Sequence, residues 1–100
     1  MENLDARVVH LVHWTKSGIT SIVKDICKSQ GHSFVLFEDD DEFNLYYSDI
    51  HDKYCAKGSV INLIKIIRNI SPRIIQAHSF LPLLVALLFG GGSKIIFHVH

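Results

Sequence analysis

The chain has 100 residues and no net charge, with ten basic and ten acidic side chains, and 48% of its residues are hydrophobic. This length suits one domain or one half of a larger domain, and the apolar content excludes a disordered chain. The balanced charge gives no sign of a nucleic-acid partner, so we predict none.

The amino-terminal residues and the apolar runs predict a cytoplasmic location. Met1 is followed by Glu2 and Asp5 and not by a basic segment with an apolar run, so a secretory signal is not recognised. The apolar run at residues 80–89 is far shorter than the roughly 20 residues that span a bilayer. Both cysteines of the chain are therefore expected to be reduced thiols.

The first third of the chain predicts a strand, a helix and a second strand. Residues 7–13 are apolar on both faces, as in a central strand that helices cover on both sides. A turn at Ser17 and Gly18 leads into a helix that ends at Gly31 in a left-handed cap. Residues 33–38 are rich in aromatic and β-branched side chains, which favours a strand.

The next stretch carries weaker patterns. An acidic run at residues 38–42 closes the second strand. Residues 43–47 are aromatic enough for a short edge strand, and residues 48–57 are polar and predict a loop. A second amphipathic helix then begins at Ser59 and ends before Pro72.

The last third of the chain predicts a strand, a helix and a strand. Residues 73–79 read Arg-Ile-Ile-Gln-Ala-His-Ser, a buried strand that ends on His78 and Ser79. Ser79 can cap a third helix, which is apolar all round and ends at residues 90–92. Residues 94–99 form the last predicted strand, which His100 follows.

This alternation predicts an α/β fold, a Rossmann-like doubly wound parallel sheet of about five strands with three helices, in one domain over residues 1–100. Right-handed crossovers give the strand order 3-2-1-4-5, which places residues 13–18, residues 78–79 and His100 along one rim. One helix then covers one face and two cover the other. We therefore predict an incomplete domain of marginal stability, with half of one face uncovered.

Three of the seven histidines are candidate site residues because each lies at the end of a strand. His13, His78 and His100 would reach the rim where such sheets bind ligands, and a neutral imidazole both donates to and accepts from hydroxyl groups. In contrast, His10 is expected to be a core histidine, and His32 is expected to contact the last carbonyls of the first helix.

Other chemistries have weaker patterns. We predict no metal site, because the histidines lack companion cysteines or carboxylates at zinc spacing. Ser79 lacks the glycine-flanked turn of a nucleophile. Glu38 lies 38 − 18 = 20 residues after Gly18, the offset of a ribose-binding acid, but the glycine fingerprint of a dinucleotide site is absent.

Taken together, these segments resemble the amino-terminal half of glycosyltransferases with the two-Rossmann-domain (GT-B) architecture, specifically family 4. The matching features are the strand at residues 8–13 before a glycine-containing loop and the helix that ends in Gly31 and His32. They also include residues 72–79, with a proline, a hydrophobic strand and the His-Ser pair, and residues 94–100, a strand that ends in a histidine.

The resemblance implies transfer of a sugar from a nucleotide-sugar donor to an acceptor hydroxyl in polysaccharide or glycolipid biosynthesis, with no obligatory metal or other cofactor. Ser17 and Gly18 would bind the donor diphosphate, and His100 would be the catalytic histidine that faces the reacting sugar. His13, His78 and Ser79 would form the acceptor site.

Two departures from the family limit what these residues are expected to do alone. Ser17 stands where the family's loop has the first of two glycines, and the carboxyl-terminal donor-binding domain is missing from these 100 residues. The chain alone is therefore expected to be inactive, with the donor domain, the nucleotide sugar and an acceptor glycan or glycolipid as partners. The full enzyme would associate peripherally with a membrane.

Two alternatives stay open from the residues alone. The first is a stand-alone flavodoxin-like module that binds a nucleotide or a small anion at the same rim. The second is a non-catalytic interaction subunit that docks a partner through the uncovered sheet face and the apolar third helix.

Overall fold

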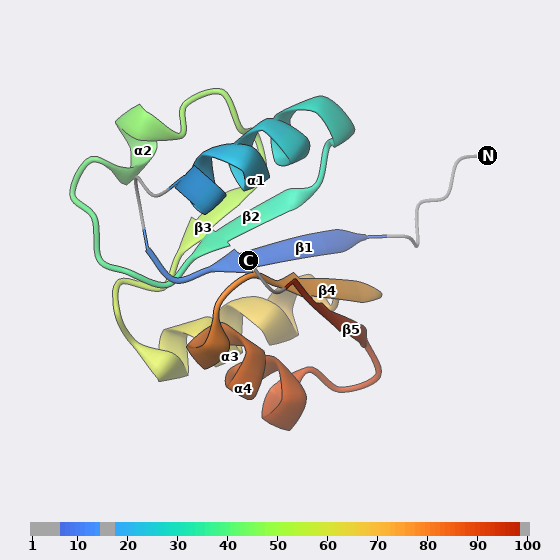
Figure 1. Cartoon of the computed structure of the whole chain (residues 1–100). Coiled ribbons are helices and arrows are strands. Elements are labelled where there is room, and N and C mark those ends of the chain that lie inside the picture. The colour runs from blue at the N-terminus through green and yellow to red at the C-terminus, as the bar shows by residue number, and fades with distance from the viewer. Residues whose placement is uncertain (1–6, 15–17, 99–100) are drawn as a thin grey trace.

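A computed structural model describes residues 7–14 and 18–98, which form a five-stranded sheet between two layers of helices (Figure 1). All neighbouring strands are parallel, and their order is β3-β2-β1-β4-β5, as predicted. The strands are β1 (Val8–Val12), β2 (Ser33–Leu36), β3 (Lys53–Cys55), β4 (Ile74–Ala77) and β5 (Lys94–Phe97). The helices are α1 (Gly18–Gln30), α2 (Phe43–Tyr46), α3 (Val60–Ile70) and α4 (Phe80–Phe89). The prediction of an α/β Rossmann-like sheet is confirmed.

Strand β1 lies at the centre of the sheet, where the strand order reverses. Val9 pairs with Ser33 of β2 on one side and with Ile75 of β4 on the other. The chain builds outward from β1 to β3 and then crosses back to add β4 and β5. In sheets of this kind, ligands bind in the crevice at the carboxyl ends of the two strands where the order reverses, which here are β1 and β4.

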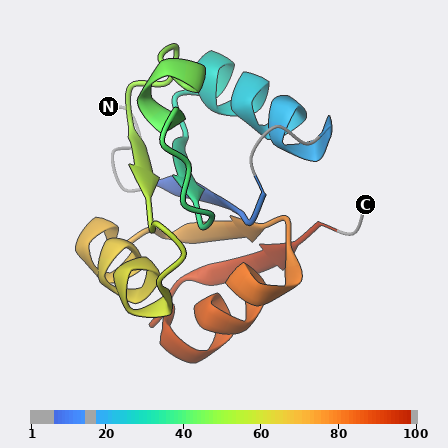
Figure 2. The ribbon, with the colours of Figure 1, turned by 90° about the vertical axis from the view of Figure 1, so that its left-hand side faces the viewer.

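The two faces of the sheet have separate cores. Figures 1 and 2 show α1 and α2 on one face and α3 and α4 on the other. The α3 and α4 side buries the apolar residues Val9, Leu11, Val35, Phe37, Ala56, Leu63, Ile67, Ile70, Ile75, Val85 and Ala86. The α1 and α2 side buries Val12, Val23, Cys27, Phe34, Leu36, Phe43, Tyr47 and Ile50. Strand β1 therefore places apolar side chains on both faces of the sheet, except at His10, which is buried on the α1 side.

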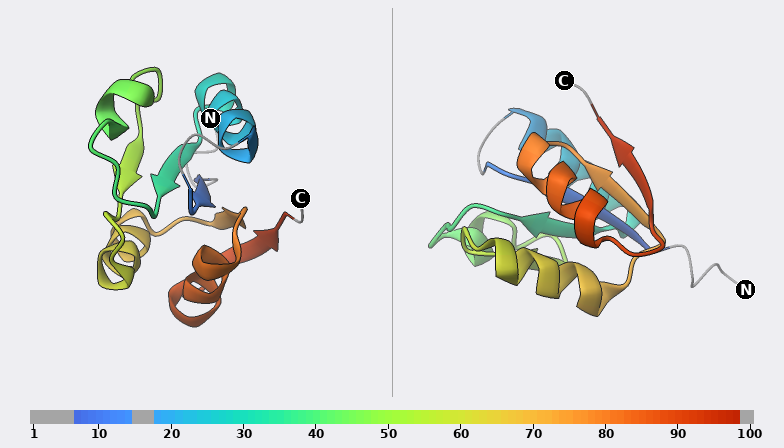
Figure 3. Two further views of the ribbon diagram at one scale, coloured as in Figure 1. Left: turned by 60° about the vertical axis from the view of Figure 1, so that its left-hand side comes forward. Right: turned by 90° about the horizontal axis from the view of Figure 1, so that it is seen from below.

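The described helices cover the α1 face only in part, as predicted. Helix α1 contacts β1 and β2, and Figure 3 shows β5 at the edge of the sheet beyond its reach. On that face lie Gln76 of β4, Ile96 of β5 and His98, which follows β5, and Ile96 is 36% exposed. A covered parallel sheet carries apolar side chains on both faces, so this polar half-face sets β4 and β5 apart.

Helix α4 is apolar all round but buried on one side only. Pro82, Val85 and Ala86 are buried against the sheet, whereas Leu87 and Leu88 are 60% and 74% exposed. Within the described part of the chain, none of the helices has both the length and the apolar character that a bilayer crossing needs.

The prediction of an edge strand at residues 43–47 is wrong, because residues 43–46 form α2 and Tyr47 ends it. The buried side chains around it are Phe43, Tyr47 and Ile50, a spacing of four and then three residues that matches one helix face. Leu45, which a strand would place on the same side as Phe43 and Tyr47, is 76% exposed. The aromatic content suggested a strand, but the spacing of the buried residues decides for a helix.

The third strand of the sheet lies instead within the predicted loop. Lys53–Cys55 pairs in parallel with β2, with Phe34 opposite Lys53 and Leu36 opposite Cys55. This edge strand has three residues, all of them partly exposed, so it lacks the apolar run that marks a central strand. With α2 the described residues form four helices, one more than predicted.

The predicted ends of the longer helices agree with the structure. Gly31 has φ +71° and follows α1, where its amide donates to the carbonyl of Cys27 at 2.9 Å. The side chain of Ser59 accepts the amide of Asn62 at 3.2 Å at the start of α3. Ser79 precedes α4, but its side chain makes no capping bond to that helix.

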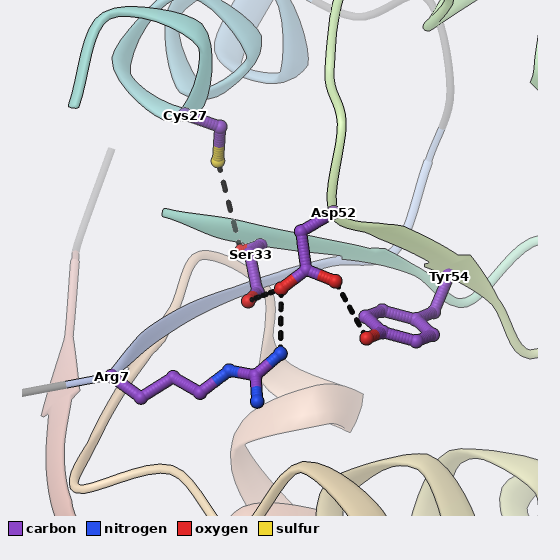
Figure 4. Close-up of polar contacts among 5 residues, drawn as sticks. All are labelled: Arg7, Cys27, Ser33, Asp52 and Tyr54. Atoms are coloured by element: carbon purple, nitrogen blue, oxygen red, sulfur yellow. Dashed lines mark hydrogen bonds and ion pairs between the residues drawn. The ribbon is translucent and has the colours of Figure 1, made fainter. Parts of the chain in front are cut away.

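Asp52 fixes the start of β3 through a small polar network (Figure 4). Its backbone carbonyl accepts the amide of Phe34, and its carboxylate accepts hydrogen bonds from Tyr54 at 2.6 Å, Arg7 at 2.7 Å and the buried hydroxyl of Ser33. Burial alone would raise the pKa of Asp52, but these three hydrogen bonds outweigh it and hold the pKa below its usual value.

We expect Asp52→Asn to lower the free energy of unfolding by about 1 to 3 kcal/mol. The substitution replaces one carboxylate oxygen, which accepts hydrogen bonds, by an amide NH₂ group, which cannot accept them. Urea unfolding at neutral pH measures the change. Asp49→Asn is the matched control. The Lys28–Asp49 ion pair is 3.3 Å long and more than half exposed, so its loss should cost little. Equal costs for both variants would contradict the role of Asp52.

Candidate functional site

The carboxyl ends of β1 and β4 are joined at the point where the strand order reverses. The amide of His78 donates to the carbonyl of Leu11 at 3.0 Å, and the amide of His13 donates to the hydroxyl oxygen of Ser79 at 3.2 Å. His13, His78 and Ser79, predicted from sequence as rim residues, thus lie together at one end of the sheet. The rim is the candidate site.

Trp14 extends this rim with an exposed aromatic surface. Its ring stacks on the imidazole of His13, with ring centroids 3.9 Å apart and planes 8° apart, and it is 57% exposed. The rings of Phe37 and His13 are T-shaped to one another, with centroids 5.1 Å apart, and the hydroxyl of the buried Thr20 donates to the carbonyl of Trp14. The sequence reasoning treated Trp14 as a loop residue. The sequence feature that could have marked Trp14 as a rim residue is its position directly after a histidine at the end of a strand.

The other predicted rim residues are placed only in part. Ser17 and His100 lie outside the described residues. Gly18 is the first residue of α1 and is exposed, and a Cβ atom at this position would meet nothing within 4 Å. The fold itself does not require glycine here, so the diphosphate-binding role of Ser17 and Gly18 and the catalytic role of His100 stay predictions.

Behind the rim, a row of histidines crosses the α1 face of the sheet. His10 Nδ1 lies 3.0 Å from His78 Nε2, and His10 Nε2 lies 2.8 Å from His32 Nδ1. His78 also stacks on His98, with ring centroids 4.5 Å apart, and His98 Nε2 lies 2.6 Å from the amide oxygen of Gln76. The row runs from the carboxyl rim at β4 and β5 to the start of β2.

The surroundings of this row keep its centre uncharged at neutral pH. Burial, with smaller contributions from the nearby His32 and His98, lowers the pKa of His10 from 6.5 to about 4. Burial also lowers the pKa of His32. A neutral imidazole has one donor and one acceptor nitrogen, so each ring in the row can satisfy a neighbour on either side.

The structure confirms one of the two predictions for the inner histidines and corrects the other. His10 is a buried core histidine, as predicted, with 1% of its surface exposed. The prediction that His32 contacts the last carbonyls of α1 is wrong, because the amide of Gly31 bonds the carbonyl of Cys27 and the ring of His32 bonds His10. The contacts of His10 with His32 and His78 join residues from three different segments, so periodicity within one strand does not reveal them.

The described part of the chain gathers no set of metal ligands, and its buried thiol is unreactive. Residues 7–14 and 18–98 hold no group of three or more His, Cys, Asp or Glu side chains arranged to bind a metal ion. Both cysteines are free, as predicted, and burial raises the pKa of the Cys27 thiol to about 12, which keeps it protonated and unreactive.

A cavity of about 640 Å³ lies at the end of the sheet opposite the rim, where α3 and α4 end and β4 and β5 begin. Arg68, Arg73 and Lys94 line it together with residues 90–92. Cations are expected at this place, because the carboxyl end of a helix carries the negative end of its dipole. The cavity has no cluster of catalytic side chains, so we assign the candidate site to the rim.

Comparisons with known proteins assign no family to this chain. No protein-family model matches the sequence, and neither a curated protein nor a solved structure matches the chain.

Proposed function

We propose that this chain is the acceptor-side, amino-terminal half of a family 4 type glycosyltransferase with the GT-B architecture, and that the rim of His13, Trp14, His78 and Ser79 binds the acceptor. One observation carries the proposal. The exposed ring of Trp14, stacked on the half-buried His13, lies beside Ser79 at the point where the strand order reverses. The Rossmann-like sheet of order β3-β2-β1-β4-β5 supports it, since a domain of this class is what the resemblance implies.

The rim offers both surfaces that recognition of a sugar needs. A sugar ring presents C–H groups on one face and hydroxyl groups around its edge, and the exposed ring of Trp14 is a flat apolar surface for the C–H face. The hydroxyl oxygen of Ser79 accepts the amide of His13, and its own O–H proton remains a donor for an acceptor hydroxyl. Fixed partners of this kind hold the hydroxyl in position for transfer.

The remaining parts of the proposal come from the resemblance. Ser17 and Gly18 would bind the diphosphate of a nucleotide sugar, His100 would face the transferred sugar, and a second domain would hold the nucleotide. The reaction would build a polysaccharide or glycolipid in the cytoplasm, with the full enzyme attached peripherally to a membrane. No metal or other cofactor takes part in the proposed transfer.

The single tryptophan of the chain makes the proposal directly testable, because fluorescence then reports on the rim alone. We expect methyl glycosides, as acceptor analogues, to change the emission of Trp14 in a saturable way. Trp14→Ala should weaken binding about three- to tenfold, the value of one aromatic stacking contact, as measured by NMR shift changes at His13. Leu88→Ala, which changes an exposed side chain of α4, is the matched control and should bind normally.

An unchanged fluorescence and NMR spectrum over a panel of methyl glycosides would overturn the acceptor role. A response to free nucleotides without any response to sugars would instead favour the flavodoxin-like binding module. The outer side of α4, with Phe80, Leu84, Leu87 and Leu88 exposed, favours an interaction subunit as the second candidate. Stable association that Leu88→Ala weakens, with no ligand response, would select that candidate.

A further inference from the structure

The hydrogen bonds of the histidine row restrict how its protons are arranged. His10 lies between the other two rings, with Nε2 facing His32 Nδ1 and Nδ1 facing His78 Nε2, so both of its ring nitrogens are engaged. Each of the two contacts needs one proton between its two nitrogens. A neutral ring carries one proton only, and the choice made at one contact therefore decides the other.

Two arrangements satisfy both contacts. In the first, all three rings carry the proton on Nε2, so that His78 donates to His10 and His10 donates to His32. In the second, all three carry it on Nδ1, and both bonds run in the opposite direction. The geometry thus forces His32, His10 and His78 into the same tautomer, and one arrangement converts to the other only when every proton moves together.

We propose that His32, His10 and His78 form a proton relay, which connects the rim at the end of β4 with water at the end of α1. The relay begins in the first arrangement. His78 accepts a proton on Nδ1 and passes its Nε2 proton to His10 Nδ1. His10 passes its Nε2 proton to His32 Nδ1, and the partly exposed His32 releases its Nε2 proton to water. One proton enters and one leaves, and the three rings end in the second arrangement.

The burial of His10 fits concerted transfer. With 1% of its surface exposed, the ring is in a place where a charge is costly, and a concerted shift never leaves it with two protons. His98 stands beside the relay and not within it. It stacks on His78 and donates from Nε2 to the amide oxygen of Gln76, so it holds the plane of the last relay ring.

The relay deepens the proposed function and rests on it for its purpose. When an acceptor oxygen bonds to the anomeric carbon, the nucleotide diphosphate leaves with the electron pair of the broken C–O bond, and the acceptor hydroxyl must lose its proton. His78 takes that proton from the rim. The reverse passage resets the three tautomers and returns a proton to the rim, where the departing diphosphate accepts it.

The test is NMR of the full chain with ¹⁵N-labelled histidine, at pH 7.5 and without ligand. We expect His32, His10 and His78 to show the same tautomer fraction, with both ring nitrogens of each at averaged shifts. Opposite tautomers at His10 and His78, or one fixed tautomer in all three rings without exchange, would overturn the relay.

Two variants sharpen the test. His32→Gln replaces the outer ring by an amide, which accepts or donates a hydrogen bond but cannot pass a proton on, so His10 and His78 should become fixed in one tautomer. His78→Gln cuts the other end and should fix His10 and His32, which keeps the test open if the first variant does not fold. The control is His51→Gln, which changes an exposed loop histidine and should leave the averaging intact. Averaging that persists in both relay variants would also overturn the proposal.

These readouts separate the relay from the proposed function. If sugars fail to bind at the rim while the three rings exchange together, then the transferase proposal fails and the relay stands. If sugars bind while the rings show opposite or fixed tautomers, then the relay fails and the transferase proposal stands.

Discussion

Replacement of Tyr47 by alanine is expected to lower the free energy of unfolding by about 3 to 5 kcal/mol, the usual cost of removing a buried aromatic side chain. Tyr47 follows α2 and has no exposed surface. Its ring centroid lies 4.6 Å from that of Phe34 on β2 and 5.2 Å from that of Phe43 on α2. The truncation would therefore remove the ring that packs between Phe43 of α2 and Phe34 of the sheet, and it would leave a cavity in the core below α1. Urea unfolding measures the loss.

Leu45→Ala is the control for this prediction. Leu45 lies within the same short helix and is 76% exposed, so its truncation should change stability by less than about 0.5 kcal/mol. The pair also tests the fold of this segment. A strand at residues 43–47 would place Leu45 and Tyr47 on the same face and make the two truncations similar in cost. Equal costs would contradict α2 and restore the sequence-based interpretation.

This segment shows where sequence reasoning reaches its limit. The long elements were predictable because each combines a clear period with an end signal, such as the left-handed glycine at Gly31 or the cap at Ser59. In contrast, α2 has four residues and β3 has three, too few for a period to appear. Their positions depend on tertiary contacts, among them the bonds of Asp52 to Ser33 and Phe34, which no local pattern reveals.

The strand order could be predicted although no strand pairing is visible in the sequence. Alternating strands and helices require parallel pairing, and right-handed crossovers then leave few arrangements. The same reasoning brings His13, His78 and Ser79 to one rim, because parallel strands end at the same edge of the sheet. In contrast, the contacts between side chains on the α1 face depend on the strand register, which pairs His10 with Gln76 and Gln76 with Ile96. Register depends on packing, so the histidine row was not predictable.

Acidification should destabilise the chain through His10, by about 3 kcal/mol between pH 6.5 and pH 4. The pKa of His10 is about 4 in the folded chain and 6.5 in the unfolded chain. Well above pH 6.5, His10 is neutral in both the folded and the unfolded chain, so the stability is not reduced. Between pH 6.5 and pH 4, His10 is protonated only in the unfolded chain, and the free energy of unfolding falls by about 1.4 kcal/mol for each unit by which the pH falls. Asp52, whose folded pKa is lowered, adds a loss only below about pH 4.

His10→Gln isolates this effect, because the amide keeps hydrogen-bonding groups at the centre of the row but does not titrate. The slope of the free energy of unfolding against pH counts the protons taken up on unfolding. Near pH 5 the parent chain should take up about one proton more on unfolding than His10→Gln. Equal slopes for the parent chain and His10→Gln would mean that His10 is charged in the folded protein at pH 5.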